Sequence, residues 1–201
     1  MTVTALIPET KGRYRVCLQG EADLVLYGKE LKQFGIAEGT DLSPEQYRRI
    51  LEEVLIPRAR KRAMHILERM DQTTAQLREK LQRSQYPEQV VEDAIAYVAS
   101  FHYIDDERFA RNFIRAYQQS RSRLRISRDL QGKGIDRDLI DRCLAEEYEV
   151  SETDQIRELL RRKGYDQGAR NRKQQDKMYR FLMQRGYRSE DIRRALWRED
   201  F

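Results

Sequence analysis

The chain has 201 residues, of which 36% are charged and 39% are hydrophobic. Gly and Pro contribute only 10 and 4 residues, so little turn-forming material is available and a mainly helical chain is expected. The modest apolar fraction argues against one large core and favours an elongated array of small cores. No apolar stretch approaches the roughly 20 residues of a membrane span, and the first ten residues lack the pattern of a signal peptide. We therefore expect a cytoplasmic protein that has no membrane partner.

The basic residues indicate the kind of partner. The formal net charge is +5, and the basic residues comprise 30 Arg and 9 Lys. Arg makes forked contacts with phosphate or carboxylate groups, so the expected partner is a polyanion, either nucleic acid or an acidic protein surface. Cys17 and Cys143 lie among apolar residues in segments of different type, which predicts buried, reduced thiols rather than a disulfide.

The first 56 residues are expected to form a small β-hairpin followed by helices. Apolar and polar residues alternate over 13–19, and a glycine turn separates this segment from an apolar run at 23–27, which predicts two strands. Ser43 begins a capping box that predicts a helix through Val54. Pro57 is expected to end this helix.

An internal repeat organises the rest of the chain. Six apolar positions recur at identical offsets, with Leu81, Leu130 and Leu182 in the same place of each copy. The six are Leu77, Leu81, Tyr86, Val91, Ala94 and Ile95 in the first copy, Ile126, Leu130, Ile135, Ile140, Cys143 and Leu144 in the second, and Met178, Leu182, Tyr187, Ile192, Ala195 and Leu196 in the third. This spacing predicts two helices joined by a tight turn, and a further amphipathic helix precedes each pair.

The repeat predicts a mainly α fold, in which the N-terminal hairpin is followed by an elongated array of tandem three-helix units of the helix-turn-helix kind. The predicted segments are 1–56 for the hairpin and its helices, and 57–104, 105–150 and 151–201 for the three repeats. The stretch 164–172 has no apolar periodicity and is expected to be a mobile loop.

The charges are segregated along this array. Residues 88–107 contain six acids and no Lys or Arg, and residues 136–154 contain eight acids against two bases. Residues 108–133 hold eight bases against one acid, and residues 157–185 hold ten against three. Part of this alternation is expected to let consecutive repeats pack through charge complementarity.

Four arginines lie within eight residues at the expected start of a helix in the second repeat, and so close a group repels itself unless an external anion is bound. We predict that this cluster is the main anion-binding patch, with two further basic residues in support. The candidate binding residues are Arg115, Arg121, Arg123, Arg125, Arg128 and Lys133.

No catalytic set can be assembled from the sequence. His65 and His102 have no Cys or Glu at metal-ligand spacing, so both are interpreted as structural. The Gly-Lys-Gly at 132–134 lacks the other glycines of a phosphate loop and follows a helix, so it is expected to end that helix. The three acids at 105–107 are explained as partners of a helix N-terminus. We expect a protein that is not an enzyme and uses no metal or cofactor.

Several separated motifs resemble one known family. Residues 103–110, the Arg-rich run at 120–128 and residues 130–135 resemble the central motif of the RecX family of bacterial recombinase regulators. The resemblance extends to the other two repeats and to the N-terminal hairpin, and it covers about residues 13 to 196. The sequence departs from the pattern at Arg123 and Leu124, where many members have Gly-Pro.

The resemblance implies a non-enzymatic modulator, mainly an inhibitor, of the RecA recombinase. Such a protein would bind in the groove of the RecA filament on DNA and restrain its ATPase, strand-exchange and coprotease activities. The alternation of basic and acidic segments predicts only weak binding of single- or double-stranded DNA, and we expect a monomer.

Two other functions fit the residues. A free-standing DNA-binding regulator could be built of tandem helix-turn-helix units, in which a recognition helix enters the major groove. The acidic character of the third helices, at 88–99 and 137–148, argues against that interpretation. A purely structural adaptor is the weaker alternative.

Overall fold

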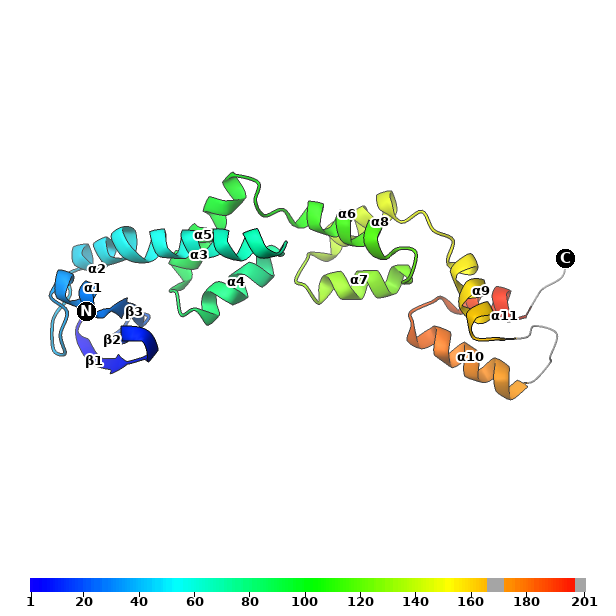
Figure 1. Ribbon diagram of the computed structural model, residues 1–201, viewed down its shortest axis with the longest axis horizontal. Helices are drawn as coiled ribbons and strands as arrows, with labels where there is room; N and C mark the ends of the chain where they lie inside the picture. Colours follow the sequence, from blue (N-terminus) through cyan, green and yellow to red (C-terminus); the bar gives the residue numbers. More distant parts are fainter. Residues whose placement is uncertain (166–171, 198–201) are drawn as a thin grey trace. The chain divides into compact units, whose positions relative to one another are not determined.

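The computed structural model describes residues 1–165 and 172–197. The chain divides into two compact units, Met1–Asp105 and Asp106–Phe201. The predicted mainly α fold, in which tandem three-helix units follow a small N-terminal β-sheet along the chain, is confirmed (Figure 1). The four-segment division of the chain stays a prediction.

The first unit begins with an antiparallel sheet in the order β1-β2-β3. Its strands are β1 (Val3–Pro8), β2 (Arg13–Leu18) and β3 (Leu24–Tyr27). The predicted hairpin is β2 and β3, in which Val16 lies opposite Leu24. The additional strand β1 was not predicted, because its apolar residues do not alternate strictly and Pro8 ends it.

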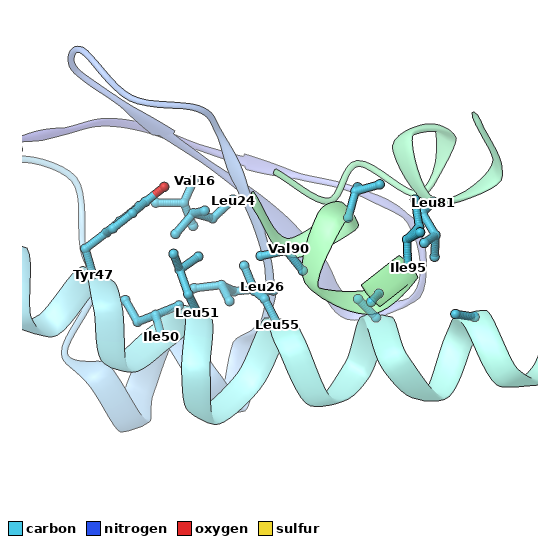
Figure 2. Close-up of a cluster of buried hydrophobic side chains, with 14 of the residues drawn as sticks. Val16, Leu24, Leu26, Tyr47, Ile50, Leu51, Leu55, Leu81, Val90 and Ile95 are labelled. Carbon is cyan, nitrogen blue, oxygen red and sulfur yellow. The ribbon is translucent and has the colours of Figure 1, made fainter. Parts of the chain in front are cut away.

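Helices cover one face of this sheet. The first unit continues with α1 (Gly28–Phe34), α2 (Pro44–Ile50), a π-helical turn at Leu51–Leu55, and α3 (Ile56–Arg69). Helices α4 (Thr74–Arg83) and α5 (Glu88–Ser100) complete its three-helix repeat. Side chains of the sheet, such as Val16, Leu24 and Leu26, meet Ile50 and Leu55 in one core (Figure 2).

The prediction that the helix ends before Pro57 is wrong. The chain stays helical from α2 into α3 through the π-helical turn, and Pro57 lies in the first turn of α3. A proline ring inside a helix clashes with the carbonyl one turn earlier and removes one hydrogen bond. The wider π turn makes room for the ring and changes the hydrogen-bond register, so the helix continues.

The second unit contains two further three-helix repeats. The first of these consists of α6 (Asp106–Tyr117), α7 (Arg123–Gln131) and α8 (Arg137–Glu147). The other consists of α9 (Glu152–Arg162), α10 (Arg172–Gln184) and α11 (Ser189–Leu196). The loop expected over 164–172 falls mostly on residues 166–171, which lie outside the described residues.

The repeated apolar positions form the cores. Leu81, Leu130 and Leu182 are each 0% exposed, as predicted for equivalent positions. In the described part of the chain, buried apolar side chains form three clusters, one shared by the sheet and the first repeat and one in each later repeat. Met178 is half-buried, whereas Leu77 and Ile126 at the same offset are fully buried.

The predicted helix caps are also present. Ser43 and Thr73 each form a complete capping box with the glutamine three residues later. The Ser122 hydroxyl accepts a hydrogen bond from the Arg125 N–H at 3.2 Å, which fixes the start of α7. Beyond α7 the left-handed residue is Gly134, at φ +80°. These caps satisfy N–H groups that the helices themselves leave unpaired.

Both cysteines are free thiols, but only Cys143 is buried; Cys17 is partly exposed. Burial raises the pKa of the Cys143 thiol. Within 1–165 and 172–197, no helix has the length and apolar character needed to cross a membrane.

Truncating the repeated leucine should destabilise the second repeat. Leu130→Ala removes a fully buried side chain from a small core, and such changes cost about 2–5 kcal/mol. We expect a clear fall in melting temperature by calorimetry. Leu124→Ala, on the same helix but 45% exposed, is the matched control and should melt close to the parent protein. Equal melting temperatures for the two variants would contradict the assigned core.

Candidate functional site

Helix α7 positions the arginine cluster that the sequence singles out. Ile126 and Leu130 are fully buried and anchor this helix in the core of the second repeat. The arginines therefore lie on its remaining faces and at its start. Arg125 and Arg128 are exposed, whereas Arg121 and Arg123 are half-buried. The N-terminal end of a helix carries partial positive charge, so these guanidinium groups increase a field that already attracts anions.

One carboxylate balances part of this charge. Asp129 accepts from Arg121 Nη1 at 2.7 Å and lies 3.1 Å from Arg125 Nε. The Arg121 guanidinium also lies over the ring of Tyr117, at 3.8 Å from its centroid. These contacts hold Arg121 in place. In the part of the chain that the structure describes, Arg123 and Arg128 form no ion pair.

The cluster is divided between two cavities on either side of α7. Arg121 and Arg125 line a cavity of about 310 Å³ together with Arg185. Arg123 and Arg128 line another of about 420 Å³, whose charged residues also include Arg137, Arg188, Asp141 and Glu152. The structure thus places three of the predicted arginines on α7 and Arg121 just before it, but it does not bring the four into one cavity.

Arg185, Arg188 and Arg137 were not predicted as part of this site. Arg185 and Arg188 come from the turn between α10 and α11, about 60 residues from α7 along the chain. No local pattern in the sequence connects them with the cluster. The Arg185 guanidinium lies 4.5 Å from the centroid of the Phe181 ring. Arg185 and Arg188, like Arg123, have no ion-pair partner among the described residues.

The two supporting residues lie in different surroundings. Arg115 pairs with Glu147 on α8, with Nε to Oε2 at 2.5 Å and Nη2 to Oε1 at 2.8 Å. Hydrogen bonds from Arg115 and Arg111 hold the pKa of Glu147 below its usual range. Lys133 Nζ lies 5.6 Å from the Phe113 ring centroid, and Arg121 lies 5.7 Å from the same ring. Lys133 is therefore close to the cluster, whereas Arg115 belongs to an ion pair inside the repeat.

Many acids of the third helices are paired in the same way. Asp93 on α5 pairs with Arg60 on α3 at 2.7 Å, and Glu92 pairs with Arg78 on α4 at 2.7 Å. For these residues and for Glu147, pairing within a repeat replaces the expected pairing between consecutive repeats. Within the second unit, pairing with Arg111 and Arg115 keeps Glu147 from neutralising the arginines of α7.

A polar network from the third repeat holds the segment that leads into α7. The Gln155 side chain donates to the Gln118 carbonyl and to the Tyr148 hydroxyl, the latter at 3.2 Å. Its Oε1 accepts from the Tyr187 hydroxyl at 3.0 Å. The Tyr148 hydroxyl in turn donates to the Arg121 carbonyl at 3.2 Å. Gln155 is 8% exposed, and buried polar groups with all partners present make such an arrangement rigid.

The first helical residue of α7 is held by the same repeat. The Arg123 N–H donates to Glu152 Oε1 at 2.6 Å. Burial raises the pKa of Glu152, and the Arg123 N–H opposes this by stabilising the carboxylate. Burial also raises the pKa of Tyr187 to about 12. Tyr187 therefore stays a neutral hydrogen-bond donor at physiological pH.

Gly186 allows the third repeat to approach the cap of α7. The Ser122 hydroxyl donates to the Arg185 carbonyl at 2.7 Å. A Cβ atom on Gly186 would lie 2.9 Å from Ser122 Oγ, and the Gly186 φ of +84° is in the region that favours glycine. The arginine helix and the α10–α11 turn are consequently assembled as one site.

Family models match all three repeats. A model described as the second three-helix domain of RecX matches residues 105–144, the third domain matches 151–196, and the first matches 59–97. The regulatory protein RecX of Cronobacter sakazakii is 33% identical over 79% of this chain and 98% of its own. That of Caldanaerobacter subterraneus subsp. tengcongensis is 27% identical over 98% of both chains.

Solved structures support the fold. A crystal structure of regulatory protein RecX has a TM-score of 0.65 and 22% identity, and covers 99% of this chain and 100% of its own. A crystal structure of RecX from Lactobacillus salivarius has a TM-score of 0.60 and 18% identity, over 73% of this chain and 97% of its own. At these identities the likeness concerns the fold alone.

Neutralising Glu152 should stabilise the protein in a pH-dependent way. Below the ordinary pKa of a glutamate the acid is protonated in both the folded and unfolded chains, and Glu152→Gln should change the melting temperature little. As the pH rises through the raised pKa of the folded state, the parent chain must ionise a partly buried group and loses stability. Gln keeps an oxygen that accepts from the Arg123 N–H. The melting temperature of Glu152→Gln should therefore exceed that of the parent protein by a few degrees at pH 7.

The measurement is thermal unfolding of both proteins from pH 4 to pH 8. Glu149→Gln removes an exposed acid from the same connecting segment and serves as the control. A difference between Glu152→Gln and the parent that stays constant across this range would show that Glu152 is not held in the surroundings described.

Proposed function

This chain belongs to the RecX family of regulatory proteins, and we propose that it is a non-enzymatic regulator, mainly an inhibitor, of the RecA recombinase. It binds in the groove of the RecA–DNA filament and modulates ATP hydrolysis, strand exchange and coprotease activity. Its role therefore lies in DNA repair and recombination.

The observation that carries this proposal is the fixed set of unpaired arginines around α7. Arg123, Arg128, Arg185 and Arg188 form no ion pair of 4 Å or less in the described parts of the chain, although Arg123 and Arg188 act through space on the Glu152 carboxylate. Guanidinium groups bind phosphate and carboxylate in a forked, directional way. The Gln155 network and the Ser122 cap fix the helix that carries two of them. A preorganised set of this kind favours binding because little side-chain and backbone freedom is lost.

A plain DNA-binding regulator is the second candidate, and the charge distribution disfavours it. A duplex-binding helix-turn-helix protein presents basic side chains from its recognition helix. In the first and second repeats, the corresponding helices α5 and α8 carry Asp93 and Glu147 instead. The unpaired arginines are on and beside α7, so the surface suits a partner that offers both phosphate and protein carboxylates.

Reversing two unpaired arginines should abolish regulation. Arg123→Glu/Arg128→Glu breaks no ion pair of 4 Å or less among the described residues and keeps the Arg123 N–H that donates to Glu152, so helicity should be retained. The new carboxylate at 123 repels Glu152, so a lower melting temperature is expected. We expect the concentration that half-inhibits RecA-dependent ATP hydrolysis on single-stranded DNA to rise at least tenfold. The control, Arg193→Glu/Arg194→Glu, makes the same charge change at exposed positions of α11 and should inhibit like the parent.

Undiminished inhibition by a folded Arg123→Glu/Arg128→Glu protein would refute the assignment of the site. Binding to filaments and to bare single-stranded DNA should be measured with the same proteins. Loss of DNA binding with filament binding retained would assign these arginines to phosphate, and loss of filament binding would assign them to the partner protein.

A further inference from the structure

A second basic cavity lies in the first unit, away from α7 in the sequence. It has a volume of about 520 Å³ and lies between the sheet, α3 and the turn from α4 to α5. Six of its lining residues are basic: Lys11, Arg13, Arg58, Lys61, Arg62 and His65. Among the described residues, those that line it include no Asp or Glu. Its volume is within the roughly 300–1,000 Å³ of small-molecule sites.

Nearby carboxylates pair with two of the five Lys and Arg side chains that line the cavity. Glu9 pairs with Arg13 at 3.1 Å, Glu30 pairs with Arg58, and Glu68 lies 3.6 Å from His65 Nδ1. Across the described residues, Lys11, Lys61 and Arg62 have no carboxylate partner. Three uncompensated cations around one hollow repel one another, and an anion bound between them would relieve that repulsion.

The backbone around the cavity departs from regular geometry at three places. Lys11 and Gln85 both line the cavity and both have φ +63°, a conformation that residues with side chains seldom adopt. The π-helical turn ends at Leu55, which also lines the cavity and is seen packed under the sheet in Figure 2. Unusual backbone conformations and π turns concentrate at functional sites. Their convergence on one cavity is independent of its charge.

Two tyrosines add a surface for planar groups. Tyr27 is 40% exposed, and the Arg58 guanidinium lies 4.9 Å from its ring centroid. Tyr86 lines the same cavity, and burial raises its pKa, which keeps the phenol a neutral donor. Aromatic rings beside Lys and Arg are the combination that binds nucleotides, because the rings stack on bases and the cations bind phosphate.

We propose that this cavity binds the phosphate groups of a nucleotide, either free or within a single-stranded nucleic acid. Lys11, Lys61 and Arg62 are the phosphate-binding residues, and Tyr27 is the stacking surface. An acidic peptide would also meet the cations, but it offers no planar base to stack on the exposed part of the Tyr27 ring. The site is distinct from the arginines of α7 and goes beyond the function proposed above.

The test is a titration of the full ¹⁵N-labelled chain followed by NMR. The probes are pyrophosphate, deoxythymidine triphosphate, a twelve-residue oligodeoxythymidine and a hexaglutamate peptide. We expect the amides of Lys11 and Gln85 to shift with phosphate-bearing probes. In Lys61→Glu/Arg62→Glu, which changes two exposed side chains, the affinity should fall at least tenfold.

The matched control is Lys32→Glu/Arg48→Glu, which makes the same charge change at exposed positions of α1 and α2. It should bind like the parent. Shifts with all phosphate-bearing probes would identify a nucleotide site, and shifts with the oligonucleotide alone would identify a strand. No shift, equal weakening in both variants, or equally tight binding of hexaglutamate would overturn the proposal. None of these results depends on regulation by α7.

Discussion

The small size of each apolar core is the constraint on which the rest of the structure depends. A three-helix repeat buries few large side chains, and units this small are marginally stable alone. The first repeat overcomes this by sharing its core with the sheet, where Leu26 and Leu55 belong to one cluster (Figure 2). The third repeat is instead joined to the second by hydrogen bonds centred on Gln155. The position of α7 therefore depends on the hydrogen bonds that connect the second repeat with the third.

The charges follow from the same arrangement. Exposed ion pairs contribute little to stability, but they decide which charges remain available. Glu147 is paired with Arg111 and Arg115, and Asp93 with Arg60. No ion pair of this kind is formed, among the described residues, by Arg123 at the start of α7, by the exposed Arg128, or by Lys61 and Arg62 on α3. The protein therefore carries localised positive sites despite its many acids.

The sequence was sufficient to predict features that depend on local periodicity. The spacing of Leu81, Leu130 and Leu182 predicted the repeats, because a helix places every third or fourth residue on one face. It could not predict that α3 continues from α2 through Pro57, because a π turn has no simple sequence pattern. It also missed Arg185, Arg188 and the Gln155 network, since these contacts connect residues about 30 to 60 positions apart.

We propose that the arginines on and beside α7 regulate a protein filament and do not act through bare DNA. Because many acids are interspersed with the basic helices, the protein can neutralise few phosphates of a strand at once. Its affinity for DNA alone should therefore be low near physiological salt, where non-specific dissociation constants are about 10⁻⁴ to 10⁻⁶ M. The most direct test is a paired salt titration of binding to single-stranded DNA and to nucleotide-stabilised RecA filaments on the same DNA. Filament binding should persist at salt concentrations that abolish binding to DNA alone, because contacts with protein carboxylates and with several subunits add to those with phosphate. Equal affinity for the two across the titration would contradict the account.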